Sequence, residues 1–186
     1  CHKPGAAGTD SRVGIHPGKD GKIATADDIL GSPGIRRLDR NGVPTNDPLY
    51  KHDRQVTDQR SPSYFAGIWA DSQFWDGRAA GEFRDPVSNA VVIQKGGSLE
   101  SQALVPLMNG AEMAKEAREW DELTKKLAGA TPLALADNIP PDMRAAVAAS
   151  STYPALFTKA FGDPLIAPTR IAFAIASYER TLVADQ

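Results

Sequence analysis

The chain has 186 residues, a length that fits one domain. Its 21 lysines and arginines against 23 aspartates and glutamates give a formal net charge of −2, so there is no basic excess to neutralise nucleic-acid phosphates. Hydrophobic residues make up 41% of the chain, which is ordinary for a globular protein that buries its own core. No apolar run approaches the roughly 18 residues that a membrane span needs.

The chain begins with Cys1 and His2 rather than with methionine. We therefore expect a mature chain or a piece of a longer polypeptide, and the lack of a signal peptide is uninformative. Cys1 is the single cysteine of the sequence. A cysteine directly before a histidine forms the end of C-x-x-C-H, the attachment motif of c-type haem, in which the histidine binds the iron. On these two residues alone, a frayed terminus without a role stays an open alternative.

Turn-forming residues crowd the first third of the chain. Residues 1–62 hold six prolines and eight glycines, whereas residues 111–186 hold six prolines and two glycines. No strand-like alternation of useful length appears, which favours a mostly α fold with long loops. Asp20, Asp27 and Asp28 faintly resemble a calcium loop, but the preceding residues are wrong for a hard cation, and we interpret the segment as a turn.

The helices are predicted from apolar spacings of three and four residues and from capping residues. Proline at a helix start and glycine after a helix end are the strongest of these signals. The first two predicted helices are 98–105, with Ser98 as its cap, and 114–128. Pro140 and Pro141 begin a third helix, which ends at Ala149. The last two are 153–161, which Gly162 ends, and a helix from Pro168 through Leu182.

The central segment places a large aromatic residue, Trp75, beside a tight turn. Asp76 and Arg78 can pair across Gly77, whose backbone is permissive, and we interpret this pair as stabilising the turn. Without further context, Trp75 would be interpreted as a buried core aromatic. Glu112 would similarly be a carboxylate in the first turn of a helix, where the helix dipole favours negative charge.

Taken together, residues from one end of the chain to the other resemble the bacterial di-haem cytochrome c peroxidase superfamily, including its MauG-type enzymes. The motifs that carry the resemblance are, in chain order, Cys-His at 1–2, Phe-Trp-Asp-Gly-Arg-Ala at 74–79, Glu-x-Gln-Ala at 100–103, Pro106, Glu-Met at 112–113 and Tyr-Glu-Arg-Thr-Leu at 178–182. The chain is similar to the first of two haem-c domains in this superfamily. A second domain would follow Leu182.

The resemblance implies a mostly α, cytochrome-c-like haem domain with long loops. Residues 1–62 would wrap the haem, and residues 63–186 would form the helical part that carries the distal residues. The segment 83–97 is similar in length to an insertion of the longer, MauG-like branch. This division treats the whole chain, 1–186, as a single N-terminal haem domain.

The resemblance also assigns a role to each candidate residue. Cys1 would be one covalent anchor of haem c, and His2 would be the proximal ligand of the haem iron. Glu112 would act as the acid–base group on the open face of the haem, with Gln102 beside it to orient peroxide and a water molecule. Trp75 would carry electrons between the two haems of the complete protein.

Three further expectations follow from the resemblance. Pro106 would help to shape the distal pocket. The sixth iron ligand stays open: His52 is slightly preferred, His16 is a weaker candidate, and a five-coordinate iron is equally compatible. Family members commonly carry asparagine before a Pro-Ser or Pro-Thr step and use it to bind calcium, whereas this sequence has Arg60 and Ser61 before Pro62, so a calcium ion is in doubt.

The function implied is a periplasmic haem peroxidase that reduces hydrogen peroxide to water. Its electrons would come from a small cytochrome c or a cupredoxin through the second haem domain of the same polypeptide. A MauG-like oxidase that modifies residues of a partner protein and a non-catalytic c-type electron carrier are the alternatives, and a haem-free helical interaction module is a third. No nucleic-acid partner and no membrane span are expected, and a homodimer is compatible with the resemblance.

Overall fold

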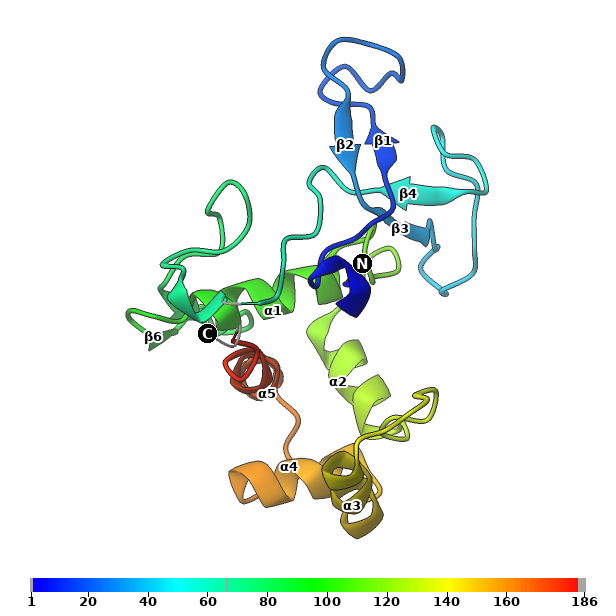
Figure 1. The fold of residues 1–186 in the computed structure, drawn as a ribbon. Helices are drawn as coiled ribbons and strands as arrows, with labels where there is room; N and C mark the ends of the chain where they lie inside the picture. The colour runs from blue at the N-terminus through cyan, green and yellow to red at the C-terminus, as the bar shows by residue number, and fades with distance from the viewer. Residues whose placement is uncertain (1, 66, 184–186) are drawn as a thin grey trace. The chain divides into compact units, whose positions relative to one another are not determined.

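The computed structural model describes residues 2–65 and 67–183 (Figure 1). The chain divides into two compact units: Cys1–Arg118 together with Ala172–Gln186, and Glu119–Ile171. Within the described residues, no helix combines the length and the apolar character that crossing a membrane would require. Cys1, the predicted covalent anchor of the haem, lies outside the described residues.

The described residues of the first unit form three two-stranded antiparallel sheets. They are β1 (Gly14–His16) with β2 (Ile29–Gly31), β3 (Pro33–Arg36) with β4 (Arg54–Val56), and β5 (Phe83–Arg84) with β6 (Val91–Ile93). Strands of two to four residues are too short to show the alternation by which a sequence reveals a strand. The expectation of a mostly α fold is therefore wrong in this respect, because the described residues combine helices with small sheets.

Helices dominate the second half of the chain, as the sequence predicted. The described residues form α1 (Ser98–Met108), α2 (Trp120–Ala128), α3 (Pro141–Ala149), α4 (Tyr153–Phe161) and α5 (Pro168–Glu179), with 3-10 turns η1 (Pro4–Ala6) and η2 (Gly67–Trp69). Four details differ from the prediction: α1 extends to Met108 instead of residue 105, α5 ends at Glu179 before Leu182, and the starts of α1 and α2 differ as follows. Gly97, not Ser98, is the N-cap of α1, because the Ser98 hydroxyl donates to the carbonyl oxygen of Ala70 at 2.9 Å. The helix predicted over 114–128 begins only at Trp120.

The second unit illustrates how local residues fix helix ends. The Thr152 hydroxyl accepts the backbone N–H of Ala155 at 3.3 Å, which satisfies one free donor at the start of α4. Gly162 ends the helix at φ 89°, a left-handed conformation that glycine adopts without a steric penalty. After this turn, both guanidinium Nη atoms of Arg170 contact the carboxylate of Asp163, at 2.6 and 2.7 Å.

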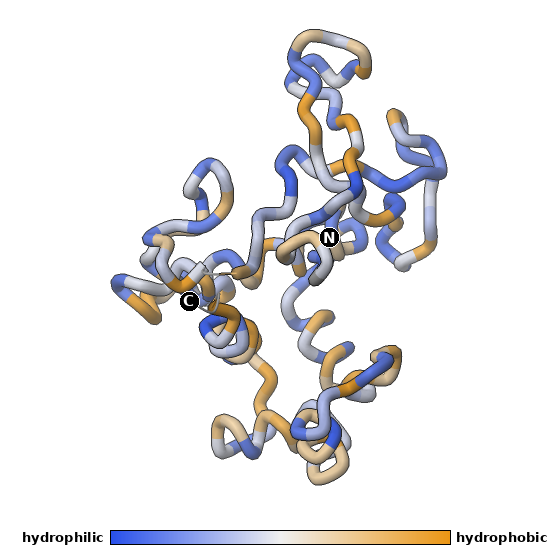
Figure 2. Tube along the Cα trace, in the orientation of Figure 1, coloured by the Kyte–Doolittle hydropathy of each residue, from blue (hydrophilic) through white to orange (hydrophobic). Residues whose placement is uncertain are grey.

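The core of the first unit lies where α1 meets the β5–β6 hairpin and the last turns of α5. Leu99 and Leu104 of α1 are buried, as is Phe83 of β5, whose ring stands edge-on to Phe173 at 6.0 Å between centroids. By contrast, Figure 2 shows apolar stretches along β1 and β2, and Leu30 in β2 is exposed. The apolar core is therefore concentrated on α1, the helix that also carries candidate site residues.

Candidate functional site

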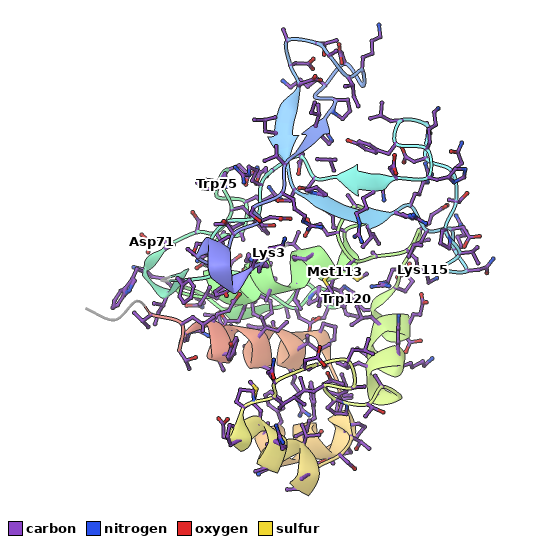
Figure 3. All side chains as sticks on the ribbon, turned by 45° about the vertical axis from the view of Figure 1, so that its right-hand side comes forward. Lys3, Asp71, Trp75, Met113, Lys115 and Trp120 are labelled. Carbon is purple, nitrogen blue, oxygen red and sulfur yellow. The ribbon has the colours of Figure 1, made fainter. Side chains whose placement is uncertain are left out.

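A pocket in the first unit collects residues that lie far apart in the sequence. His2, Gln102, Pro106 and Glu112 all line it. The rest of its described lining consists of residues 57–62, Phe74 and Arg78. In Figure 3, Lys3 and Met113, the chain neighbours of His2 and Glu112, are drawn beside α1. The structure thus brings four of the predicted site residues to one place.

The local chain explains how the Glu112 side is positioned. Gln102 and Pro106 stand four residues apart in α1, so they share one helix face. After α1, the carbonyl oxygen of Asn109 accepts the N–H groups of Glu112 and Met113 at 3.1 and 2.9 Å, which closes a tight turn. This turn is tied to β3, because the Ile35 N–H donates to the carbonyl oxygen of Ala111 at 3.0 Å.

Gly34 is the residue that lets β3 approach this turn. A Cβ atom built on Gly34 would overlap the carbonyl oxygen of Ala111, so the contact requires a residue without a side chain. Gly110, which precedes Ala111, has open space around the corresponding position. The backbone of β3 therefore supports the turn that holds Glu112.

The imidazole of His2 has one nitrogen engaged by the backbone. Its Nδ1 lies 2.7 Å from the carbonyl oxygen of Gly8. Because a carbonyl oxygen only accepts, Nδ1 carries the proton, and in the neutral ring Nε2 is then left with its lone pair. A backbone carbonyl that fixes the tautomer in this way is a common second partner of metal-binding histidines. Nε2 is therefore the ring atom through which His2 could bind a metal.

The described residues contain no group of three or more histidine, cysteine, aspartate or glutamate side chains that could hold a metal ion. A single imidazole of this kind suits an iron whose other ligands come largely from a macrocycle.

The predicted turn at Asp20 is confirmed, since Asp27 Oδ2 accepts the N–H groups of Lys19 and Asp20 at 2.6 and 3.0 Å. The carboxylate of Asp27 therefore stabilises the loop that contains it.

Burial is the main influence on Glu112. It raises the pKa of the Glu112 carboxyl above its usual range, while the positive charge of Arg78 lowers it and the nearby Asp58 raises it. A raised pKa brings a carboxyl group closer to the range in which it can both donate and accept a proton during a reaction. The electrostatics of Glu112 thus suit an acid–base group.

A second pocket adjoins the first and shares His2 and Gln102 with it. Leu99, Tyr64 and Glu179 also belong to its described lining. Burial and the neighbouring Glu100 raise the pKa of Glu179 to about 7. Its Oε2 is buried and has no hydrogen-bond partner among the described residues. No spacing or composition signal singles out this glutamate, although it stands in the motif at 178–182.

The turn that carries Trp75 is built as the sequence predicted. Asp76 and Arg78 form an ion pair at 2.8 Å across Gly77, whose φ is 71°. The interpretation of Trp75 as a buried aromatic is wrong, because the residue is 71% exposed, and Figure 3 shows it on the surface of its loop. The indole Nε1 donates to the carbonyl oxygen of Arg60 at 2.8 Å, and Arg60 lines the first pocket.

The two candidates for a sixth iron ligand lie elsewhere. His16 belongs to β1, and its Nδ1 accepts the N–H of Gly18 at 3.3 Å. His52 is exposed in the chain between β3 and β4. Neither is among the described residues that line the two pockets. Ligation by either histidine stays a prediction.

Comparison with known proteins gives two findings. The sequence model of the family described as di-haem cytochrome c peroxidase matches residues 1–186. The methylamine utilization protein MauG of Methylophilus methylotrophus is 27% identical over 127 residues, which make up 68% of this chain and 26% of that protein. The matched region thus spans about a quarter of the length of that relative.

Proposed function

Because the chain belongs to the di-haem cytochrome c peroxidase family, we propose that it is a haem-binding part of an oxidoreductase that reduces hydrogen peroxide to water. The observation that carries this proposal is the pocket shared by His2, Gln102 and Glu112. It combines a histidine whose Nε2 could bind a metal with a half-buried carboxyl group and a side-chain amide, which are groups that peroxide cleavage uses.

The residues present fit a c-type haem. His2 would hold the iron of the haem through Nε2, while its Nδ1 donates to the carbonyl oxygen of Gly8. Pro62, Phe74 and Pro106 supply apolar surface in the first pocket, and Leu99 adds to it in the adjoining one. Cys1 would supply a thioether bond to the macrocycle. When bound, the haem would supply the electron-transfer chemistry that amino-acid side chains lack.

Glu112 would move a proton between the two oxygen atoms of the peroxide. Its carboxylate accepts the proton from one oxygen and then delivers it to the other, which leaves as water. Over the full reaction, two protons and two electrons convert one peroxide molecule into two water molecules. Burial of Glu112 raises its pKa and so favours the donating step, while Arg78 limits that rise.

Gln102 would orient the peroxide. Its amide both donates and accepts hydrogen bonds, so it can hold a peroxide oxygen or a water molecule beside the carboxyl of Glu112. Pro106 stands on the same face of α1 and also lines the pocket. Because proline has no backbone N–H, Pro106 adds apolar surface but no hydrogen-bond donor. Polar contacts with the peroxide would therefore come from Gln102 and Glu112.

Electrons would arrive through Trp75 from a second haem domain of the same polypeptide. The exposed indole supports this assignment, because an aromatic ring at the surface is available to a neighbouring domain. Its hydrogen bond to Arg60 connects it to the pocket lining. A small cytochrome c or a cupredoxin in the bacterial periplasm would be the ultimate donor.

A second candidate is a MauG-like oxidase that modifies residues of a partner protein. The identity with MauG favours it, although only about a quarter of that protein is matched. The two candidates use the same pocket and differ in the source of electrons. Peroxide consumption that depends on a reduced cytochrome or cupredoxin would favour the peroxidase, and consumption that depends on an oxidisable partner protein would favour the oxidase.

The test is Glu112→Gln in the full-length, haem-loaded protein. We expect peroxide turnover to fall by about 100-fold, the scale of a general acid–base contribution, with an unchanged haem absorption spectrum. Glu116→Gln is the matched control, because Glu116 lies in the same segment but pairs with Arg40 at the surface. Wild-type turnover in Glu112→Gln would refute the acid–base role, and a protein without a haemochrome spectrum would refute the function.

A further inference from the structure

A groove separate from the haem site lies on the β3–β4 hairpin. Ile35, Leu38 and Val56 give it an apolar lining, together with Pro33 and Pro44. The charged residues of its described lining are Arg36, Asp53 and Arg54. None of these residues lines the pockets around His2. The groove therefore needs an explanation that the proposed reaction does not give.

Two arginines stand opposite each other in this groove. Arg36 and Arg54 are partners in the antiparallel register of β3 and β4, so their side chains leave the same face of the hairpin. Like charges in directly opposite positions destabilise a strand pair. A bound carboxylate would offset the repulsion, because it can accept hydrogen bonds from two guanidinium groups at once.

The two guanidinium groups differ in what they already contact. Arg54 Nη1 donates to the carbonyl oxygen of Gly34 at 2.8 Å. Within the part of the chain that the structure describes, no hydrogen bond or ion pair engages the guanidinium of Arg36. The groove contains one carboxylate, that of Asp53, and two guanidinium groups, so its net charge is positive. Arg36 is thus available to an anionic group from outside.

We propose that this groove binds an acidic segment of a partner protein, with a carboxylate between Arg36 and Arg54 and apolar side chains on Ile35 and Leu38. Side chains of an extended segment alternate between its two faces, so every second residue can face the groove. Arg36, Asp53 and Arg54 are exposed, whereas small-molecule sites enclose most of their ligand, so the groove suits an extended segment better than a small ligand.

The experiment uses the haem-loaded protein and a fluorescently labelled peptide of eight residues that alternates glutamate with leucine. Fluorescence anisotropy measures its binding. We expect saturable binding that weakens as ionic strength rises, because the contact is electrostatic and exposed. In Arg36→Glu, the peptide should bind at least tenfold more weakly. A loss of about this size is expected when one charged contact is removed.

The variant is chosen so that the hairpin survives. Arg36→Glu turns a like-charge cross-strand pair into an opposite-charge pair, so the thermal melting temperature should not fall. Lys22→Glu makes the same change of charge in the loop between β1 and β2 and should leave peptide binding unchanged. A folded Arg36→Glu variant with reduced binding supports the proposal.

Other outcomes overturn it. Equal binding by the wild type and by Arg36→Glu would show that the peptide binds elsewhere. Absence of binding, or equal binding of a peptide that alternates lysine with leucine, would remove the charge argument. Octanoate serves as a small amphipathic acid: if it binds in an Arg36-dependent manner while the glutamate peptide does not, the groove is a small-molecule site and the proposal of a protein partner is wrong.

Discussion

Arg180 and Glu100 form a bidentate ion pair, with Nη1 at 2.7 Å from Oε1 and Nη2 at 2.9 Å from Oε2. Glu100 lies in the first turn of α1 and is only 3% exposed, and Arg180 follows the last residue of α5. The pair therefore joins two segments that are 80 residues apart in the chain. It also compensates a buried negative charge beside the site.

Arg180→Gln is expected to destabilise the protein by about 3 kcal/mol, because it leaves the carboxylate of Glu100 buried without its cation. Chemical denaturation followed by circular dichroism measures the change. Arg84→Gln is the control, since Arg84 forms a comparable 2.7 Å contact with Glu82 at the surface. There the expected cost is below about 1 kcal/mol. Equal costs for the two variants would contradict the role of burial.

The raised pKa of Glu179 predicts how the free energy of unfolding depends on pH. Its pKa is raised from 4.5 to about 7 by burial and by Glu100. Between these two values the folded chain keeps a proton that the unfolded chain has released, so the free energy of unfolding decreases as pH rises through this window. The stabilising contribution of protonated Glu179, which is fully present below pH 4.5, is therefore lost by about pH 7. Its size is on the order of 1 kcal/mol after allowance for partial solvent exposure.

Urea denaturation at pH 5 and pH 8 measures this effect. In Glu179→Gln the difference in midpoint between the two pH values should shrink relative to the wild type. Asp10→Asn serves as the comparison: hydrogen bonds from Arg12 lower the pKa of Asp10 to about 2, so its contribution is lost only as pH falls below about 4. An unchanged pH dependence in Glu179→Gln would show that this carboxyl is not the titrating group.

Gly34→Ala should displace the turn that carries Glu112, because the new Cβ would overlap the carbonyl oxygen of Ala111. We expect a loss of stability of about 2 kcal/mol, typical of overpacking, and a fall in peroxide turnover. Thermal melting and a turnover assay on the haem-loaded protein measure the two effects. Gly110→Ala has open space at the new Cβ and should change both by little. If both variants behave alike, the β3 contact does not support the site.

Trp75→Phe keeps an aromatic ring but removes the indole N–H that donates to Arg60. If Trp75 carries electrons, donor-dependent turnover should fall by about tenfold, whereas peroxide binding, followed by the haem absorption spectrum, should stay unchanged. Trp69→Phe is a matched control, because Trp69 is 76% exposed on the neighbouring 3-10 turn. A similar loss in both variants would point to a general surface effect.

Local signals predicted the helices well. Tyr153–Phe161 begins and ends as expected, because Thr152, Pro154 and Gly162 act through their immediate neighbours. The strands were missed, since pairs such as β3 and β4 are set by contacts between residues about 20 positions apart and not by a repeating pattern. The late start of α2 has the same origin, because the N–H of Glu116 donates to the carbonyl oxygen of Leu38 at 3.0 Å, a contact between distant parts of the chain.

The candidate site shows a similar division. The resemblance to a known family selected His2, Gln102 and Glu112, and the structure places them in one pocket. Hydropathy and spacing alone could not have done so, because the positions lie in a terminal loop, a helix and a turn. Glu179 was missed because its unusual pKa depends on burial and on Glu100, and both are properties of the folded chain.

The hydrogen bond from His2 to Gly8 spans only six positions, and Gly8 in turn donates its N–H to the carbonyl oxygen of Lys3 at 3.0 Å. Loops of about ten residues close within roughly 10–100 ns, far sooner than distant segments of a chain find one another. One contact that orients the imidazole is consequently made within the first few residues. If His2 binds haem iron as proposed, its Nε2 would already be oriented when the haem is attached to the unfolded polypeptide.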